Sequence, residues 1–104
     1  MDRRKSLRFR LQLPLVSRWT DGDGQVRYVA GFSRDICDRG VFIVSSERPH
    51  VGTTVSVNVQ LPYIQADLQE LHLQSAGSVV RVEQVEDVSG FAVQCDFRGL
   101  EDIA

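Results

Sequence analysis

Alternation of apolar and polar residues constrains the fold of this chain more than any other feature. Residues 54–61 read TVSVNVQL, so every second side chain is Val or Leu and those between are polar. The same period of two recurs in residues 9–15 and 91–97. Successive side chains of a β-strand point to opposite faces, so this period predicts strands with one buried face. Other apolar runs predict three more strands, at residues 26–32, 40–44 and 71–85.

Turn-forming residues fall between these runs. Residues 21–24 read Asp-Gly-Asp-Gly, which favours a β-hairpin. Turns are also predicted at residues 38–40, 49–52 and 88–90. Helical signal is confined to one expected turn at residues 63–70 and the start of a helix near the C-terminus. Six short strands joined by regular turns predict an all-β fold, either an antiparallel sandwich or a small barrel, because closure removes exposed strand edges.

Four residues carry local expectations. Pro14 cannot donate to a strand ladder, so we expect it at a sheet edge or a bulge. Gly77 interrupts the longest apolar run and predicts a bulge or bend there. Cys95 occupies an apolar position of its strand and is expected in the core. Trp19, near the end of the first strand, is expected to pack in the barrel or at its rim.

Basic residues are concentrated at the N-terminus. The chain of 104 residues has a net charge of −2, but residues 1–10 alone carry +4. A basic segment on an acidic body, with a sequence pI of 5.6, favours a local anion-binding site over an extended nucleic-acid-binding surface. The length is that of a single domain.

Several functional classes are disfavoured by what the sequence contains. No apolar stretch approaches the ~20 residues of a membrane span, and the basic N-terminus is not followed by the apolar segment of a secretory signal, so we expect a cytoplasmic protein. Cys37 and Cys95 form no CxxC motif, and His50 and His72 lack the spacing of metal ligands. Since no nucleophile–base motif is present, we expect neither an enzyme nor a metal site.

Two short segments carry the chemistry of the chain. Arg4 and Arg8 form an R-x-x-x-R motif before the first strand, and two guanidinium groups so spaced can close around one anionic ligand. The second segment is D-I-C-D-R-G, from Asp35 to Gly40, at a turn between two strands. A carboxylate such as Asp35 can accept hydrogen bonds from the N1–H and N2–H edge of guanine. The small Cys37 and Gly40 would let a ligand approach the backbone.

The two motifs, in this order on a six-strand pattern, resemble those of the PilZ domain family of bacterial receptors for cyclic di-GMP. That family carries R-x-x-x-R in an N-terminal loop and [D/N]-x-S-x-x-G after its second strand. The segments Gly77–Glu83 and Gly90–Cys95 also resemble its last two barrel strands. The resemblance covers about residues 3–98 and implies a six-stranded antiparallel barrel with at most a short C-terminal helix.

The resemblance also implies roles for individual residues. Arg4 and Arg8 would contact guanine faces and phosphates, with help from the preceding Arg3. Asp35 would read a guanine edge, and Gly40 is the closing glycine of the second motif. Cys37 stands where the family usually has serine.

The thiol at position 37 is a poorer hydrogen-bond partner than a hydroxyl. One lost hydrogen bond is worth about 0.5–1.5 kcal/mol, so a few-fold to tenfold weaker binding is expected.

The sequence therefore predicts a flexible basic arm over residues 1–8 and a barrel domain over residues 9–104. Cyclic di-GMP would order the arm, and the domain would then signal to a partner protein, with no DNA or RNA bound and no separate cofactor. The alternative is a PilZ-like adaptor that binds a protein and no nucleotide. A single-stranded nucleic-acid-binding barrel ranks third. Simpler interpretations stay open: the arginines could form a solvated tail, and Asp35 and Asp38 could be turn formers, which is the preferred interpretation for Asp38.

Overall fold

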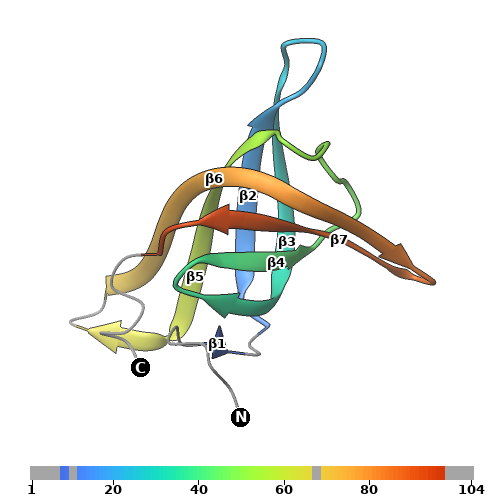
Figure 1. Cartoon of the computed structure of the whole chain (residues 1–104). Helices are drawn as coiled ribbons and strands as arrows, with labels where there is room; N and C mark the ends of the chain where they lie inside the picture. The colour runs from blue at the N-terminus through green and yellow to red at the C-terminus, as the bar shows by residue number, and fades with distance from the viewer. Residues whose placement is uncertain (1–7, 10–11, 67–68, 98–104) are drawn as a thin grey trace.

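Six strands of this chain close into an antiparallel barrel (Figure 1). The computed structural model describes residues 8–9, 12–66 and 69–97, with side chains for residues 12–60, 73–84 and 86–97. The strands are β1 (Arg8–Phe9), β2 (Pro14–Thr20), β3 (Val26–Cys37), β4 (Gly40–Val44), β5 (Thr54–Ala66), β6 (Gln69–Val85) and β7 (Val88–Cys95). Their order in the sheet is β1-β3-β2-β5-β6-β7-β4, and β3 also pairs with β4, which closes the ring. The predicted six-stranded antiparallel barrel is confirmed, and the described residues contain no helix.

The N-terminal strand differs from its prediction. Of the expected single strand at residues 9–15, the described residues belong to two strands, β1 and β2, and Gln12 and Leu13 lie outside both. The alternation continues through β2, but its central inward position is the buried Ser17 rather than an apolar residue. The Ser17 hydroxyl donates to the carbonyl of Val29 at 3.3 Å, which satisfies it inside the barrel. Pro14 is at neither the expected sheet edge nor a bulge: it is the first residue of β2, a strand between β3 and β5, and its missing N–H is tolerated at a strand end.

The predicted helical turn at residues 63–70 is wrong. Among the described residues of this segment, β5 continues to Ala66 and β6 begins at Gln69, with Gln65 paired to Glu70 and Ala66 to Gln69. Extending an existing two-stranded ladder satisfies backbone groups that one isolated helical turn would leave unpaired. The expected helix start at residues 100–103 lies outside the described residues.

The predicted turn at residues 88–90 belongs to β7, and the chain reverses at Glu86 and Asp87 instead. Glu86 has a φ of 54°, in the left-handed region that tight turns use. Gly90 is needed for packing, because a Cβ there would overlap the carbonyl oxygen of Ile43. The hairpin at residues 21–24 is as expected, with the Asp21 carboxylate accepting from the backbone N–H of Asp23 at 2.9 Å.

The core fills the barrel with the inward side chains of all six strands. Trp19 and Phe91 form its aromatic centre, edge to face with ring centroids 6.0 Å apart. Trp19 is only 6% exposed, so it is a packing residue rather than a rim residue. The other members are mostly aliphatic: Leu13, Leu15, Val29, Ile36, Val41, Ile43, Val55, Val57, Val59, Leu73, Val79, Val93, Cys95 and Phe97. The period-two prediction of buried faces is therefore confirmed on β2, β5 and β7.

Candidate ligand-binding groove

Two β-bulges turn polar side chains to the outside of the barrel at one place. In β3, Ser33 pairs with Ile43 and Asp35 with Phe42, so Arg34 is the extra residue. Ser33 is fully buried, and Arg34 and Asp35 both lie on the outer side. A bulge re-aims side chains in this way because two residues of one strand face one residue of its partner.

The second bulge lies in β6, where Val79 pairs with Val93 and Arg81 with Ala92. Val79 is buried in the core, whereas the extra residue, Val80, and Arg81 are both exposed. The bulge predicted at Gly77 is thus displaced to Val80. Gly77 has another role, because a Cβ there would overlap the backbone carbonyl of β7.

The bulges flank a groove of about 340 Å³ on the outer surface of β4 and β7. Its lining contains the predicted site residues whose side chains the structure describes, Asp35, Cys37 and Gly40. Arg39 and Arg81 add two positive charges to the same lining. The β3–β4 turn thus brings its predicted ligand-binding residues into one cavity with two arginines.

A charged network fixes one end of this groove. The guanidinium of Arg34 lies over the ring of Phe42, with Cζ 3.8 Å from the ring centroid, and Arg81 Cζ lies 5.7 Å from the same centroid. Glu83 joins the two arginines, at 3.5 Å from Arg34 Nη1 and 2.6 Å from Arg81 Nε. Arg34 Nε also donates to Asp35 Oδ2 at 3.2 Å. Phe42 points out of the barrel but is only 3% exposed, since the arginines cover it.

The network therefore orients the Asp35 carboxylate and the Arg81 guanidinium at the groove. These groups are partly exposed, so solvent screens the individual ion pairs and their role is orientation more than stability. Phe42, Arg34 and Glu83 were not predicted from the sequence. The sequence feature that could have indicated them is a break in the apolar–polar alternation at Ser33–Ile36 and Val79–Val82. At each break two successive residues lie on the same face of the strand.

The last residue of the N-terminal motif is paired with a strand that lines the groove. β1 pairs antiparallel with β3, and Arg8 stands directly opposite Cys37, with Phe9 opposite Ile36. The second arginine of R-x-x-x-R thus enters the sheet beside the D-I-C-D-R-G turn. The side chains of Arg3, Arg4 and Arg8 lie outside the described part of the structure.

The β3–β4 turn is tied to the end of β7. The carbonyls of Asp38 and Arg39 accept hydrogen bonds from the backbone N–H groups of Phe97 and Cys95, at 3.1 and 3.0 Å. Asp38 lies in the turn, as expected of a turn former, but its Oδ1 is buried without a hydrogen-bond partner among the described residues. Gly40 is required by the strand pairing itself, because a Cβ there would overlap the carbonyl oxygen of Val93.

The two cysteines have different environments. Cys37 is half-buried in the groove lining. Cys95 is in the core as predicted, and burial raises the pKa of its thiol to about 12. A hydrogen bond with Ser75 lowers this pKa, but by less than burial raises it. Burial disfavours the charged thiolate, so Cys95 stays neutral.

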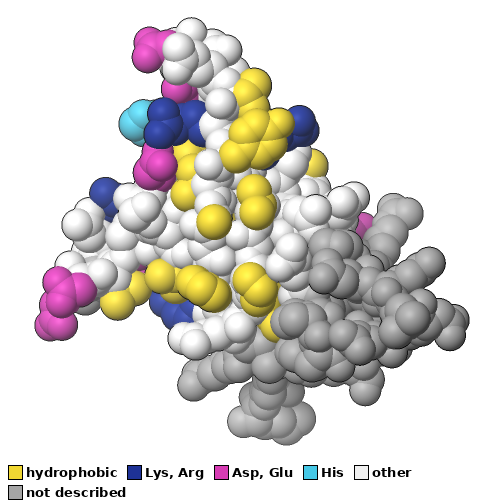
Figure 2. Space-filling view, turned by 180° about the vertical axis from the view of Figure 1, so that it is seen from behind, with side chains coloured by type: hydrophobic (Ala, Val, Ile, Leu, Met, Phe, Trp, Pro, Cys, Tyr) yellow, Lys and Arg dark blue, Asp and Glu magenta, His cyan; other side chains and the backbone are white. Residues whose placement is uncertain are grey.

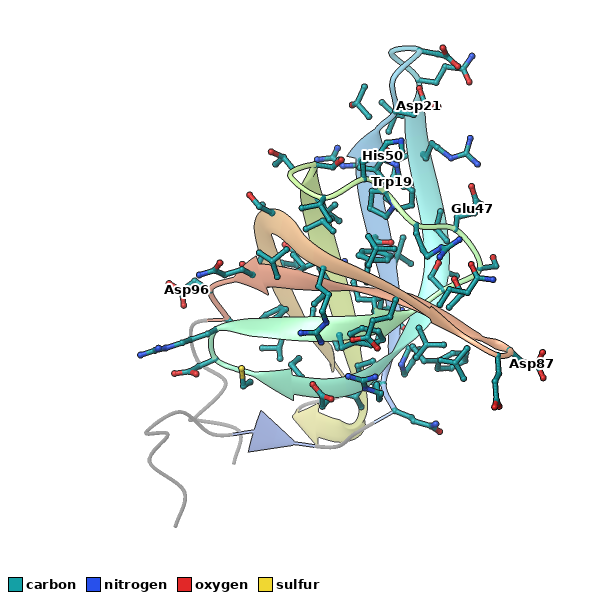
Figure 3. All side chains as sticks on the ribbon, turned by 45° about the vertical axis from the view of Figure 1, so that its right-hand side comes forward. Trp19, Asp21, Glu47, His50, Asp87 and Asp96 are labelled. Atoms are coloured by element: carbon teal, nitrogen blue, oxygen red, sulfur yellow. The ribbon has the colours of Figure 1, made fainter. Side chains whose placement is uncertain are left out.

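A second polar cluster lies at the far end of the barrel, around the β2–β3 hairpin (Figure 3). Arg27 pairs with Glu47 and lies 3.8 Å from the Asp21 carboxylate, and these residues line one hollow together with His50. Across the described residues no group of His, Cys, Asp and Glu has the arrangement of a metal site. The ion pairs of Arg27 link the β2–β3 hairpin to the segment after β4. The groove at the β3–β4 turn is the candidate site because the predicted residues Asp35, Cys37 and Gly40 line it.

Comparison with known proteins agrees with the fold and the motifs. A sequence profile described as PilZ domain matches residues 2–103. Among solved structures, the Bacillus subtilis inhibitor of motility (MotI/DgrA) superimposes with a TM-score of 0.74 at 13% sequence identity. The match covers 98% of this chain and 46% of that chain, so the present chain spans less than half of that protein. At this identity the likeness shows the fold alone.

No curated protein sequence matches the chain significantly. Within the part of the chain that the structure describes, no helix has the length and apolar character needed to cross a membrane. The resemblance drawn from the two motifs is confirmed by the profile match, which includes both of them.

Proposed function

Because this chain belongs to the PilZ domain family, we propose that it binds cyclic di-GMP in the groove at the β3–β4 turn and signals to a partner protein. One observation carries this proposal. Asp35, Cys37 and Gly40 line a single groove with Arg39 and Arg81, and the backbone of Arg8 lies opposite Cys37. The described end of the first motif, Arg8, is therefore paired with the strand that carries the second motif, which supports a shared site.

Each group has chemistry suited to this ligand. Cyclic di-GMP carries two phosphates and two guanines, and arginine offers forked donors for phosphate and a flat face for a base. Asp35 supplies an acceptor for the N1–H and N2–H edge of guanine, and its orientation is set by Arg34 at 3.2 Å. Arg4 and Arg8, with Arg3, are the groups that we expect to close over the phosphates from the N-terminal arm.

The signal in this proposal is a change in the arm. Like charges within residues 1–10 repel one another, and a doubly anionic ligand cancels that repulsion. Binding then fixes the arm over the groove and presents a new surface to a partner. The size of the switch is limited by the difference in ligand affinity between the two states of the arm.

The second candidate is a protein-binding PilZ adaptor that binds no nucleotide. Two observations favour it. Cys37 replaces the serine hydroxyl of the family motif, and the Asp35 carboxylate forms an ion pair with Arg34 at 3.2 Å. A ligand must therefore share or displace an existing ion pair without the help of a hydroxyl.

Isothermal titration calorimetry with cyclic di-GMP separates the two candidates. The proposal expects binding heat with the wild type and loss of at least tenfold in affinity for Arg8→Ala and for Asp35→Ala. Arg48→Ala and Asp23→Ala are matched controls, because both residues are exposed and neither lines the groove. Absence of heat from the folded wild type would select the adaptor, and equal affinity in all four variants would remove Arg8 and Asp35 from the site.

A further inference from the structure

The face of the barrel away from the groove is almost free of charge. The registers of β3, β2, β5 and β6 place alternate residues of these strands side by side on the outer surface. The outward positions are every second residue, counted from Pro14, Val26, Thr54 and Gln74. Among those that the structure describes, Arg18 is the one charged residue, although charged residues make up 25% of the chain. We define the neutral face as these outward positions within residues 14–20, 26–32, 54–60 and 74–78.

Large apolar side chains are exposed on the neutral face. Tyr28 is 69% exposed, Phe32 55%, Val26 54% and Val16 41%. The view from behind the barrel shows hydrophobic side chains following one another down this side (Figure 2). A hollow of about 630 Å³ lies beside Tyr28, with Val16 in its lining. A patch that combines exposed aromatics with a single arginine has the composition of a protein–protein interface.

The pattern along β3 fits a second copy of the same chain. Outward residues follow in the order Tyr28, Ala30, Phe32, so a small residue separates two aromatic ones. A two-fold axis passing near Ala30 would bring each Phe32 against Tyr28 of the other copy, and Ala30 would allow the sheets to approach closely. The Phe32 side chain of each copy would then point toward the hollow beside Tyr28 of the other copy.

Charge also favours self-association over a charged partner. Arg18 stands in register with Tyr28, at one end of the row and away from the proposed axis. Pairing about Ala30 would therefore place Arg18 near the aromatic Phe32 of the other copy and not against a second Arg18. A strongly charged partner would lose solvation on this neutral face without finding opposite charges.

We propose that the neutral face is an interface between two copies of this chain, related by a two-fold axis near Ala30. The face offers fewer residues than the roughly 20–30 per side of a standard interface, so the dimer is weak and forms at micromolar or higher concentration. The bulge at Arg34 separates this half of β3 from the half that carries Asp35. Both grooves of the dimer therefore stay open, and the inference does not depend on nucleotide binding.

Sedimentation equilibrium over about 5–500 μM tests the proposal. The wild type is expected to show a monomer–dimer equilibrium, and Ala30→Arg to weaken it at least tenfold, because two guanidinium groups would meet at the axis. Val51→Arg is the matched control, since Val51 is 62% exposed and lies in a turn outside the neutral face. Circular dichroism and thermal melting establish that both variants are folded. A wild type that stays monomeric throughout, or equal weakening by the control, would overturn the proposal.

A crosslink tests the position of the axis. Only residues near a two-fold axis lie close to their own copies, so Ala30→Cys should form a covalent dimer under mild oxidation. Val51→Cys in the same conditions should remain monomeric. Both variants are made in the Cys37→Ser background, which leaves the buried Cys95 as the other thiol. Equal crosslinking of the two variants would contradict an axis near Ala30.

Discussion

Replacing Cys37 by serine tests the one departure from the family motif. The Cys37 side chain is half-buried in the lining of the groove, in a strand position opposite Gly40 and Arg8. Serine has nearly the same shape and restores a hydroxyl that donates and accepts hydrogen bonds. One such bond to the ligand is worth about 0.5–1.5 kcal/mol, which corresponds to about twofold to tenfold tighter binding of cyclic di-GMP by Cys37→Ser.

The control for this comparison is Cys37→Ala, which removes the thiol without adding a hydroxyl. Calorimetric titration of the three proteins should rank their affinities as Ser above Cys, with Ala equal to or below Cys. Thermal melts should be close to one another, since position 37 is outside the core cluster. Equal affinities for Cys37→Ser and Cys37→Ala would refute the hydrogen-bonding role that we assign to this position.

Further predictions concern packing, thiol chemistry and electrostatics. Gly77→Ala should lower stability by about 1–3 kcal/mol, because the new Cβ overlaps the Gln94 carbonyl; Gly22→Ala, in open space, should leave the melting temperature within a degree or two. At pH 8 a thiol reagent should label Cys37 but not Cys95 in the native protein and both in denaturant, and two fast-reacting native thiols would contradict the burial of Cys95. Burial raises the Cys95 pKa from its ordinary 9.0 to about 12, so between these values the unfolded chain loses the thiol proton while the folded protein keeps it. The stabilising contribution of the neutral thiol is therefore full below pH 9 and is lost as pH rises toward 12. Urea melts of wild type and Cys95→Val should converge or cross in that range. Calorimetry at increasing salt should show weaker nucleotide binding, because exposed arginines would contact phosphates; affinity independent of salt would argue against such contacts.

The barrel was predictable because its signal is local. Alternation in residues 54–61 and 91–97 identifies half-buried strands without any knowledge of their partners, and β5 and β7 contain most of these residues. The predicted extent of the first strand was wrong because a polar residue is buried at an inward position. Ser17 is fully buried among apolar residues, which hid the continuation of β2.

The two motifs of the site could be predicted from the sequence, but the other residues that surround them in the groove could not. Asp35, Cys37 and Gly40 are adjacent in sequence, so their clustering follows from one turn. Phe42 and Arg81 reach the same place through strand pairing and two bulges. Strand register depends on contacts distant in the sequence, and a single sequence does not specify it residue by residue.

The N-terminal arm can close over cyclic di-GMP only if the nucleotide binds in the groove at the β3–β4 turn. A ¹⁵N–¹H NMR titration of the whole chain measures this directly. We predict the largest amide shifts at residues 35–40, with further shifts around Arg81 and residues 92–94, and little change at Val16 or Tyr28 on the neutral face. No shift at saturating nucleotide, or shifts gathered on the neutral face, would contradict binding in the groove.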